Sequence, residues 1–475
     1  MHAFEGIVWV AQGKSMSDTT TATWVPDIAG RSGPIYLRIV EALAQDHADG
    51  ALHPGDRLPA QRALAERLGV DLTTVTRAFS EARRRNLIDA AAGRGSFVTA
   101  RGPEEPILDL GMNIPPSPLG LNLPGLIRGG IDGLLKRSSA EALLSYHPGP
   151  GSPAERGAGV SWLEGSAGRR LPLDRVGVGA GAQALLTAVL LSTAREGDAV
   201  LVDTLTYPGF IGLARTLRLR LVSVGADAEG MRPDMLEAMA KETHARLVYL
   251  NPTLHNPTTR VVPETRRHDI AAVARRLNLA IIEDDPYAPL LADKAPASFL
   301  AIAPEATFHV ATLAKCISPF LRTAFIAAPS AEALNRVAAS LRSLTLMAAP
   351  LMTSLASEWV RSGVAEEIVG GVRAEVRARH EIAAAVLPGG ARLNPDAFHA
   401  WLELGTRQQA SVVFETARAQ GLAVSPAADF STGDKAPEAV RVALGAIGSR
   451  ERLADALRRL ATVLGTPGAA TAAMV

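Results

Sequence analysis

The sequence predicts a small, mainly helical N-terminal domain, then a larger α/β domain with a mostly parallel sheet that ends in a small α+β domain. Two observations predict this division. Residues 30–100 are rich in arginine and in helical patterns. From about residue 175 to residue 330, short apolar runs alternate with helical patterns, which is typical of a sheet covered on both faces. A length of 475 residues is enough for two or three domains.

The expected boundaries follow from local composition. Residues 17–23 are mostly Ser, Thr and Asp, so we expect a disordered lead over residues 1–29. Residues 101–118 hold five prolines and predict a linker that runs into an extended segment. These boundaries leave residues 30–100 for the helical domain and residues 119–475 for the α/β domain.

Bulk composition limits the classes of function. The formal net charge is only +1, so any binding to nucleic acid needs a local basic surface. Residues 31–101 provide one, with 11 Arg against 8 Asp and Glu, and no lysine. The single cysteine, Cys316, excludes an internal disulfide framework and fits a reducing compartment. The sequence shows no signal peptide and no membrane-spanning apolar run, so we expect a soluble cytoplasmic protein.

The segment DRLPAQRALAERLGVDLTTVTRAFSEARRRN, residues 56–86, predicts two helices joined by a short turn. Gly69 ends the first helix and Asp71 begins the second. The apolar side of the second helix is formed by Leu72, Val75, Phe79 and Ala82, and its polar side by Thr74, Arg77 and Arg84. This is helix-turn-helix geometry, whose second helix can enter the major groove of DNA.

Residues 86–100 predict two short strands joined by a Gly-Arg-Gly tip. Such a hairpin is a wing, which would bring Arg94 near the phosphates of DNA. On helix spacing alone, an ordinary helical hairpin with solvated arginines explains the pattern as well as DNA binding does.

Residues 34–98 resemble the winged helix of GntR-type transcription regulators. The resemblance rests on the stretches PIYLRIVEAL, GALHPGDRLPAQRALAERLGV, TTVTRAF and GRGSFV. It implies that double-stranded DNA is contacted by Arg62, Thr74, Arg77 and the wing at Gly95. The family often has arginine where this chain has Leu72, and this departure puts in doubt which bases are contacted.

Lys315 is unusual among the six lysines because it lies between two apolar, strand-like runs. Burial lowers the pKa of a lysine amine, which can then act as a nucleophile and form a Schiff base. Position alone favours a lysine whose tip extends to solvent, and the features that follow reverse this preference. Nearby, the segment IIEDDPY ends a strand with Asp284 and Tyr287. A carboxylate and a phenol suit the pyridine nitrogen and the 3′-oxygen of a pyridoxal ring. A metal site is disfavoured there because no His or Cys cluster accompanies the acids.

Further polar positions fit the same ligand. The segment VGVGAGAQALL predicts a Gly-rich loop before a helix, where backbone N–H groups of Gly181 and Ala182 can hold a phosphate. Taken alone, a Gly-rich turn is weak evidence. Arg322, seven residues after the lysine, can reach the same phosphate. Asn256 can donate to the 3′-oxygen, and Tyr207 offers a face for the ring.

In this order, these residues are similar to the fold-type I aminotransferases over about residues 107–465. The resemblance implies pyridoxal 5′-phosphate as the cofactor, with Lys315 as its Schiff-base lysine. It implies Asp284 on the pyridine nitrogen, Asn256 and Tyr287 on the 3′-oxygen, and Tyr207 stacked on the ring. It further implies Gly181, Ala182 and Arg322 on the phosphate, Tyr146 reaching in from a partner subunit, and Arg441 on a substrate carboxylate.

Three features of this second resemblance are open. Arg441 is explained equally well as an ordinary surface arginine on a strand. Ala314 stands where a serine often contacts the phosphate, and Thr259 stands where many members have glycine. Both departures suggest a site that binds the cofactor with altered properties.

Together the two parts resemble the MocR group of GntR-type regulators. That resemblance implies a homodimer which binds DNA, and a small amine or amino acid effector bound through the cofactor, with the change passed to the DNA-binding domain as a population shift. The alternative is a catalytically active pyridoxal phosphate-dependent aminotransferase with an appended DNA-binding domain. A third possibility, a DNA-bound protein with an inactive cofactor fold, is disfavoured by the intact set of site residues.

Overall fold

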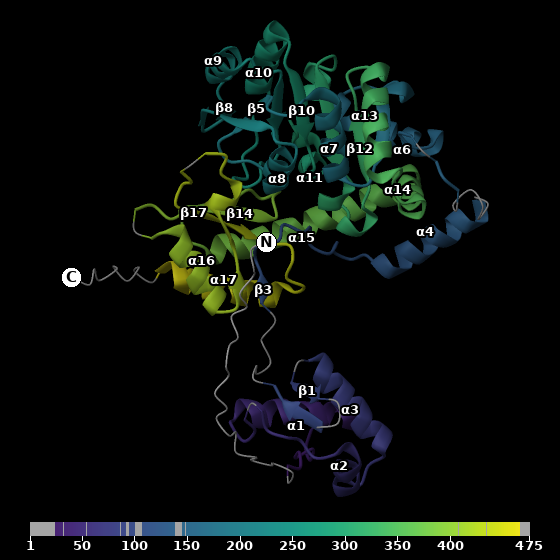
Figure 1. Ribbon diagram of the computed structural model, residues 1–475, viewed down its shortest axis with the longest axis vertical. Coiled ribbons are helices and arrows are strands. Elements are labelled where there is room, and N and C mark those ends of the chain that lie inside the picture. Colours follow the sequence, from purple (N-terminus) through teal and green to yellow (C-terminus); the bar gives the residue numbers. More distant parts are fainter. Residues whose placement is uncertain are drawn as a thin grey trace, which may run out of the picture. The chain divides into compact units, whose positions relative to one another are not determined.

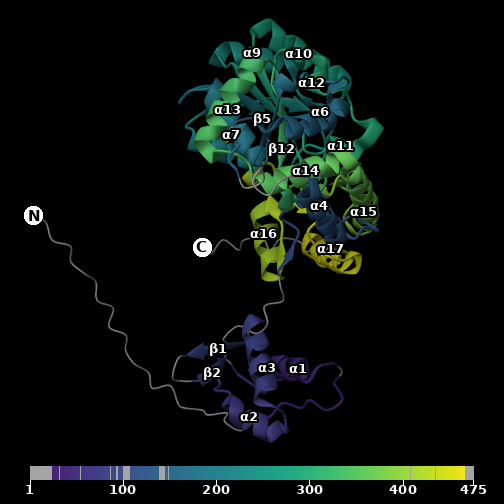
Figure 2. The same ribbon diagram turned by 90° about the vertical axis from the view of Figure 1, so that its right-hand side faces the viewer.

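The structure is a computed structural model. It describes residues 24–31, 33–53, 55–85, 87–91, 95–99, 107–137, 145–147, 149–406, 408–433 and 435–465. The chain divides into two compact units, Met1–Ile107 and Leu108–Val475, each with its own core. Figures 1 and 2 show the elements of each unit.

The described residues of the N-terminal unit form three helices and a two-stranded hairpin; Figure 2 shows their arrangement. Its elements are α1 (Ile35–Ala48), α2 (Gln61–Leu68), α3 (Leu72–Arg84), β1 (Ile88–Ala91) and β2 (Gly95–Val98). The turn between α2 and α3 begins at Gly69, whose φ of 63° lies in the left-handed region that glycine adopts without strain. The strands pair antiparallel, with Ile88 opposite Val98. The predicted winged helix-turn-helix is therefore confirmed.

Helix α3 packs its apolar side onto this unit's core through Val75, Phe79 and Ala82, which are all buried. The prediction that Leu72 shares this buried side is wrong, because its side chain is 41% exposed. Leu72 is the first residue of α3, and its side chain lines a surface depression together with Ile35 and Arg62.

The second unit is built on a seven-stranded sheet, as the alternating pattern predicts. Its strands run in the order β4 (Val176–Gly179), β12 (Ala324–Ala327), β11 (Thr307–Thr312), β10 (Ala280–Asp284), β9 (Leu247–Leu250), β5 (Ala199–Asp203) and β6 (Arg220–Val224). All neighbours pair parallel except β12, which is antiparallel to both β11 and β4. A mostly parallel sheet is confirmed.

Strand β4 differs from the prediction of a Gly-rich loop. Glycine has a low preference for strands, so the sequence VGVG gives a weak signal. In the fold, a Cβ at Gly179 would lie 2.7 Å from the side chain of Leu185, and one at Gly177 would lie 3.0 Å from that of Leu334. The glycines therefore let two helices approach this edge strand closely.

Helices cover both faces of the sheet (Figures 1 and 2). One face carries α7 (Ala182–Thr193), α8 (Pro208–Thr216) and α13 (Ala331–Thr345). The other carries α6 (Pro153–Ala167), α9 (Pro233–Thr243), α10 (Glu264–Leu277), α11 (Ala288–Leu291) and α12 (Phe299–Ile302), with α4 (Leu123–Arg137) and α14 (Pro350–Ser362) further out. No helix among the described residues is long and apolar enough to cross a bilayer.

A smaller α+β part follows the long helix α15 (Val364–Val386). Its sheet has the order β13 (Ala391–Arg392), β14 (His399–Glu403), β17 (Ala439–Ala443) and β16 (Ser425–Pro426). Helices α16 (Ala410–Ala419) and α17 (Arg450–Gly465) pack on it. The predicted small C-terminal α+β domain is present within the second unit.

The segment after residue 107 differs from the linker expected over residues 101–118. Strand β3 (Leu108–Asp109) pairs in parallel with β15 (Leu422–Ala423), and Leu110 is fully buried in the core of the small α+β part. The second unit therefore begins at Leu108, because the apolar residues of this proline-rich segment are needed to complete that core.

Candidate cofactor and DNA-binding sites

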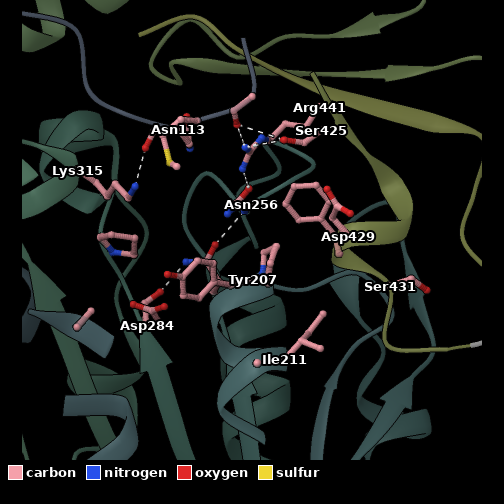
Figure 3. A pocket seen from close by; sticks show the side chains of 18 of the residues that line it. Asn113, Tyr207, Ile211, Asn256, Asp284, Lys315, Ser425, Asp429, Ser431 and Arg441 are labelled. Atoms are coloured by element: carbon pink, nitrogen blue, oxygen red, sulfur yellow. Dashed lines mark hydrogen bonds between the residues drawn. The ribbon is translucent and has the colours of Figure 1, made fainter. Parts of the chain in front are cut away.

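A pocket of about 730 Å³ lies where β9, β10 and β11 end (Figure 3). Carboxyl ends of parallel strands are the usual ligand-binding edge of an α/β sheet. Seven of the predicted site residues line it, namely Ala182, Tyr207, Asn256, Asp284, Tyr287, Lys315 and Arg441. The structure thus brings together residues that are up to 259 positions apart in the chain.

Lys315 ends a short 3₁₀ turn that follows β11 directly. Burial, together with the positive charge of Arg441, lowers the pKa of Lys315 to about 8, although Asp284 opposes the shift. Its Nζ donates a 2.5 Å hydrogen bond to the backbone oxygen of Asn113. About a tenth of this amine is therefore neutral, and so nucleophilic, at pH 7, far more than for a lysine with an ordinary pKa.

Asp284 is the last residue of β10 and is buried. The Tyr249 hydroxyl donates to Oδ2 at 2.7 Å, and the Asn251 side chain donates to the Asp284 backbone oxygen at 2.6 Å. Oδ1 has no partner among the described residues, although it is buried. Burial raises the pKa of Asp284 to about 6, while the bond from Tyr249 lowers it. Oδ1 of Asp284 is thus a buried acceptor at the pocket wall that is available to a ligand.

Tyr287 and Asn256 lie on the same wall and are both engaged by neighbours. The Asn113 side chain donates to the Tyr287 hydroxyl at 2.9 Å, and Arg441 donates to Oδ1 of Asn256 at 2.8 Å. Burial raises the pKa of Tyr287, so its hydroxyl stays protonated and can donate.

The start of α7 forms a cradle with Arg322; Ala182 lines the pocket, whereas Gly181 and Arg322 are not among its lining residues. Gly181 has a φ of +89°, and a Cβ there would lie 3.4 Å from Nη2 of Arg322. The guanidinium of Arg322 therefore lies beside the start of α7 at Ala182, whereas the Gly181 N–H donates to the Gly179 carbonyl at 2.8 Å. Two or more N–H donors and an arginine at a helix N-terminus suit a phosphate.

Tyr207 precedes α8 and lines the pocket with its ring. Burial and the nearby Asp284 raise the pKa of its hydroxyl, which donates to Gln183 at 3.4 Å. A Cβ at Gly209 would lie 2.3 Å from the ring, so glycine is required there to seat Tyr207.

Arg441 lies on the central strand β17 and is 6% exposed, so it is not an ordinary surface arginine. Its guanidinium donates to the backbone oxygen of Gly111 and, at 3.2 Å, to the Ser425 hydroxyl. It also lies 4.9 Å from the centre of the Phe430 ring. A buried cation with a donor aimed at the pocket fits a carboxylate.

Tyr146 is not among the residues that line the pocket. Tyr146 lies within the residues that the structure describes, and it is 74% exposed. Its predicted role, contacting the cofactor of a partner subunit, needs this exposure but is not tested by a single chain.

Among the pocket residues that escaped sequence analysis are Thr312, Asn251 and Asn113. Thr312 lies three residues before Lys315 and lines the pocket, and its hydroxyl accepts a hydrogen bond from the Ala314 amide at 3.2 Å. This spacing was a usable signal. Asn251 lies in the same loop as Asn256 and could have been noticed beside it. Asn113 had no signal, because it lies 202 positions from the lysine in a proline-rich segment.

The predicted DNA-contacting residues of the N-terminal unit lie near the surface of α2, α3 and the hairpin. Arg62 and Thr74 line one depression, and Thr74 and Arg77 line a second with Tyr36. The Arg77 guanidinium lies 4.0 Å from the centre of the Tyr36 ring. Arg94 lies outside the described residues.

Gly95 begins the second strand of the hairpin and has a neighbour that was not predicted. A Cβ at Gly95 would lie 3.2 Å from Nε of Arg57, which is exposed. Arg57 therefore adds a positive charge beside the wing. Its position before α2 gave no signal that it would meet the hairpin.

Comparison with known proteins matches both units to families. Residues 105–460 match the aminotransferase class I and II family, and residues 35–98 match the gntR family of bacterial regulatory proteins. An uncharacterized HTH-type transcriptional regulator of Bacillus subtilis, YdeF, is 28% identical over 458 residues, which cover 93% of this chain and 97% of that protein.

Aminotransferases match the second unit. The 2-aminoadipate transaminase of Thermus thermophilus is 28% identical over 342 residues, covering 69% of this chain and 83% of the transaminase. The crystal structure of α-aminoadipate aminotransferase from Thermus thermophilus, complexed with N-(5′-phosphopyridoxyl)-L-leucine, superposes with a TM-score of 0.68 at 25% identity. The match covers 75% of this chain and 92% of that structure. The chain therefore belongs to the aminotransferase class I and II family and carries a GntR-family domain ahead of it, the arrangement of the MocR-type regulators.

Proposed function

We propose that the protein is a DNA-binding transcriptional regulator whose second unit binds pyridoxal phosphate and, through it, an amine or amino acid effector. One observation carries the proposal. The pocket holds a lysine with a lowered pKa, a buried carboxyl group whose Oδ1 has no partner among the described residues, and a buried arginine, within a chain that also has a winged helix-turn-helix. The regulator YdeF shares both parts over nearly its full length.

The residues present fit the cofactor. The unpaired Oδ1 of Asp284 is a buried acceptor that would hold the protonated pyridine nitrogen, and pairing with that charge would lower the raised pKa of Asp284. The backbone at Gly181 has a φ of +89°, which glycine adopts without strain and which brings the start of α7 beside Arg322. When bound, the cofactor supplies an aldehyde that reacts reversibly with primary amines.

The chain's own groups then have defined roles. Lys315 would hold the cofactor covalently, and its lowered pKa leaves it nucleophilic at physiological pH. Tyr287 and Asn256 would donate to the 3′-oxygen, and Tyr207 would cover one face of the ring. Arg322, with the backbone of Gly181 and Ala182, would bind the phosphate.

The effector must carry a primary amine, because only a primary amine exchanges with a lysine in a Schiff base. Arg441, buried on β17, would bind a carboxylate of that effector. We therefore favour an amino acid over a simple amine.

DNA binding would use the surface of α3 and the hairpin. Arg62, Thr74 and Arg77 would contact phosphates or base edges, and Gly95 with Arg94 would form the wing contact. This activity places the proposed site of action in the cytoplasm.

A homodimer would complete the pocket. Several apolar side chains of the second unit are 38–57% exposed. They lie on α4, on the 3₁₀ turn Pro319–Leu321, at or just after the end of α13, and at the start of α14, and they are Leu135, Phe320, Leu344, Leu346 and Leu351. Burying such residues against a second copy would stabilise a dimer. Arg322 is exposed in the single chain, and Tyr146 of the other copy would come from the same side.

A second candidate is a working aminotransferase with an appended DNA-binding domain. The match to 2-aminoadipate transaminase and the seven predicted site residues that line the pocket favour it. Steady conversion of an amino donor and a keto acid, many turnovers per chain, would support this alternative.

The test combines absorbance and DNA binding. Purified protein should show a visible band with pyridoxal phosphate that disappears in Lys315→Ala. It should also bind the DNA upstream of its own gene in a salt-sensitive manner, and this binding should be lost in the double variant Arg62→Ala, Arg77→Ala. A colourless wild-type protein, or one that does not bind DNA at low salt, would contradict the proposal.

A further inference from the structure

Two apolar side chains lie at the surface where helix α3 begins. Leu72 is the first residue of α3 and Ile35 is the first residue of α1, and each is 41% exposed. Both line one surface depression together with Arg62 and Thr74, two of the residues predicted to contact DNA. Neighbouring apolar groups that stay exposed at a binding surface mark a place for an apolar group of the partner.

The charges around Leu72 do not suit a phosphate. Glu66 and Asp71 line the same depression as Arg62, and all three are exposed, so two negative groups stand against one positive group. The second depression of this unit differs, because Arg77 lines it and no acid is among the described residues that do. A phosphate is therefore expected beside Arg77, and the neutral edge of a base pair beside Leu72.

The start of α3 is the part of this helix that meets base edges when a helix-turn-helix enters the major groove. Two hydrogen bonds fix its position. The Val70 amide donates to the Ala65 oxygen at 3.1 Å and closes the turn. The Thr76 hydroxyl donates to Oε1 of Gln61 at 2.9 Å and joins α3 to α2. The side chain of Leu72 has no hydrogen-bond donor or acceptor, so it can recognise a base only through an apolar group. In the major groove, thymine presents such a group, its C5-methyl group.

We propose that Leu72 determines specificity by contacting the C5-methyl group of a thymine in the major groove, with Ile35 beside it. The inference rests on the DNA binding of the proposed function and adds one base of the DNA site to it. An arginine in place of Leu72 would instead donate two hydrogen bonds to a guanine. Burying one methyl group changes Kd by about fourfold. The contact therefore distinguishes thymine from the other bases without a hydrogen bond.

Selection of binding sites from random-sequence DNA gives the first test, with the full-length wild type and full-length Leu72→Arg in parallel. The wild type should enrich thymine at one position of the site, and Leu72→Arg should enrich guanine at or next to that position. Selected sites that share no thymine, or the same selected sites for both proteins, would overturn the contact.

A change of one methyl group gives the second test. In the selected duplex each thymine is replaced in turn by uracil, which pairs in the same way and lacks only the methyl group. One replacement should weaken binding of the wild type about fourfold and leave binding of Leu72→Ala unchanged. Cytosine and 5-methylcytosine at that position should differ by the same factor for the wild type but not for Leu72→Ala.

Leu173→Ala is the matched control, because Leu173 is also 41% exposed but lies in the second unit. This variant should respond to uracil as the wild type does. A wild type that binds the thymine and uracil duplexes equally, or a loss that is the same in Leu72→Ala, would overturn the methyl contact and leave DNA binding standing. A wild type that binds no duplex at low salt would overturn both.

Discussion

The hydroxyl of Tyr249 donates a 2.7 Å hydrogen bond to Oδ2 of Asp284, and Oδ1 of the same carboxyl group has no partner among the described residues. The pair is buried beneath the pocket, and Tyr249 is held in place by stacking on Phe210 with ring centres 3.7 Å apart. Tyr249 thus fixes one oxygen of Asp284 and leaves the other for a ligand.

Replacing Tyr249 with phenylalanine should weaken binding of pyridoxal phosphate most strongly at low pH. The change keeps the stacking on Phe210 but removes a bond that lowers the pKa of Asp284, so this pKa should rise above about 6. A larger fraction of Asp284 is then protonated at pH 6.5 and unable to pair with the pyridinium. At pH 6.5 the loss of binding free energy should be about 1–2 kcal/mol, or roughly tenfold in Kd, and it should be smaller at pH 8.5. Titrations at the two pH values measure it; an equal loss at both would speak against this role of Asp284.

The rate at which the cofactor-free protein takes up pyridoxal phosphate should rise with pH to a midpoint near 8. Only the neutral amine of Lys315 attacks the aldehyde, and its pKa is lowered to about 8 by burial and by Arg441. The rate at pH 7 should therefore be about one tenth of its plateau, whereas an ordinary lysine would give no plateau below pH 10. Stopped-flow absorbance follows the uptake. A midpoint above pH 10 would show that the amine is not perturbed.

Gly181→Ala should weaken recognition of the phosphate in particular. The φ of +89° disfavours any residue with a Cβ by about 1–3 kcal/mol, so an alanine would shift the backbone beside Arg322. The preference for pyridoxal phosphate over pyridoxal, measured as a ratio of Kd values, should fall about tenfold. Gly157→Ala is the matched control, because Gly157 lies inside α6 with open space around it. Gly157→Ala should keep the same ratio of Kd values as the wild type. A similar fall of the ratio in Gly157→Ala would show that the effect comes from a general disturbance of the fold.

Replacing Arg77 with lysine should leave the general affinity for DNA unchanged but should reduce discrimination between DNA sequences. The guanidinium lies 4.0 Å from the Tyr36 ring centre, and lysine would keep the charge but lose the planar fork. Arg77→Lys should keep the salt dependence and lose about 1–3 kcal/mol of discrimination between a selected site and unrelated DNA. Arg85→Ala is the control, since Arg85 forms an ion pair with Glu81 at the end of α3. Unchanged discrimination in Arg77→Lys would place Arg77 on the phosphates instead.

The sequence predicted the strands of the large sheet well where an apolar run gave a strong local signal. Apolar runs at residues 199–203, 220–224 and 307–312 coincide with β5, β6 and β11. Strand β4 was missed because two of its four residues are glycine, and the role of those glycines is evident only when the packed helices are in place. The exposure of Leu72 could not be predicted either. Periodicity shows which face of a helix is apolar, but it does not show whether the neighbouring elements reach far enough to cover that face at its first residue.

Site residues could be proposed from short motifs, but their interactions could not. Lys315, Asp284 and Arg322 stand near strand ends, where spacing alone suggests a role. The contacts of Asn113 with Lys315 and Tyr287 join positions 202 and 174 residues apart, and no local pattern encodes such a pairing. The second unit also starts within the proline-rich stretch, because β3 finds its partner more than 300 residues later.

The most direct test of the account measures DNA binding of the full-length protein, loaded with pyridoxal phosphate, while amino acids are added and the visible band is followed in the same sample. We predict that one amino acid shifts the band and changes DNA affinity over the same concentration range, and that Lys315→Ala binds DNA but shows neither response. An effector that changes DNA affinity equally in the wild type and in Lys315→Ala would contradict sensing through the cofactor.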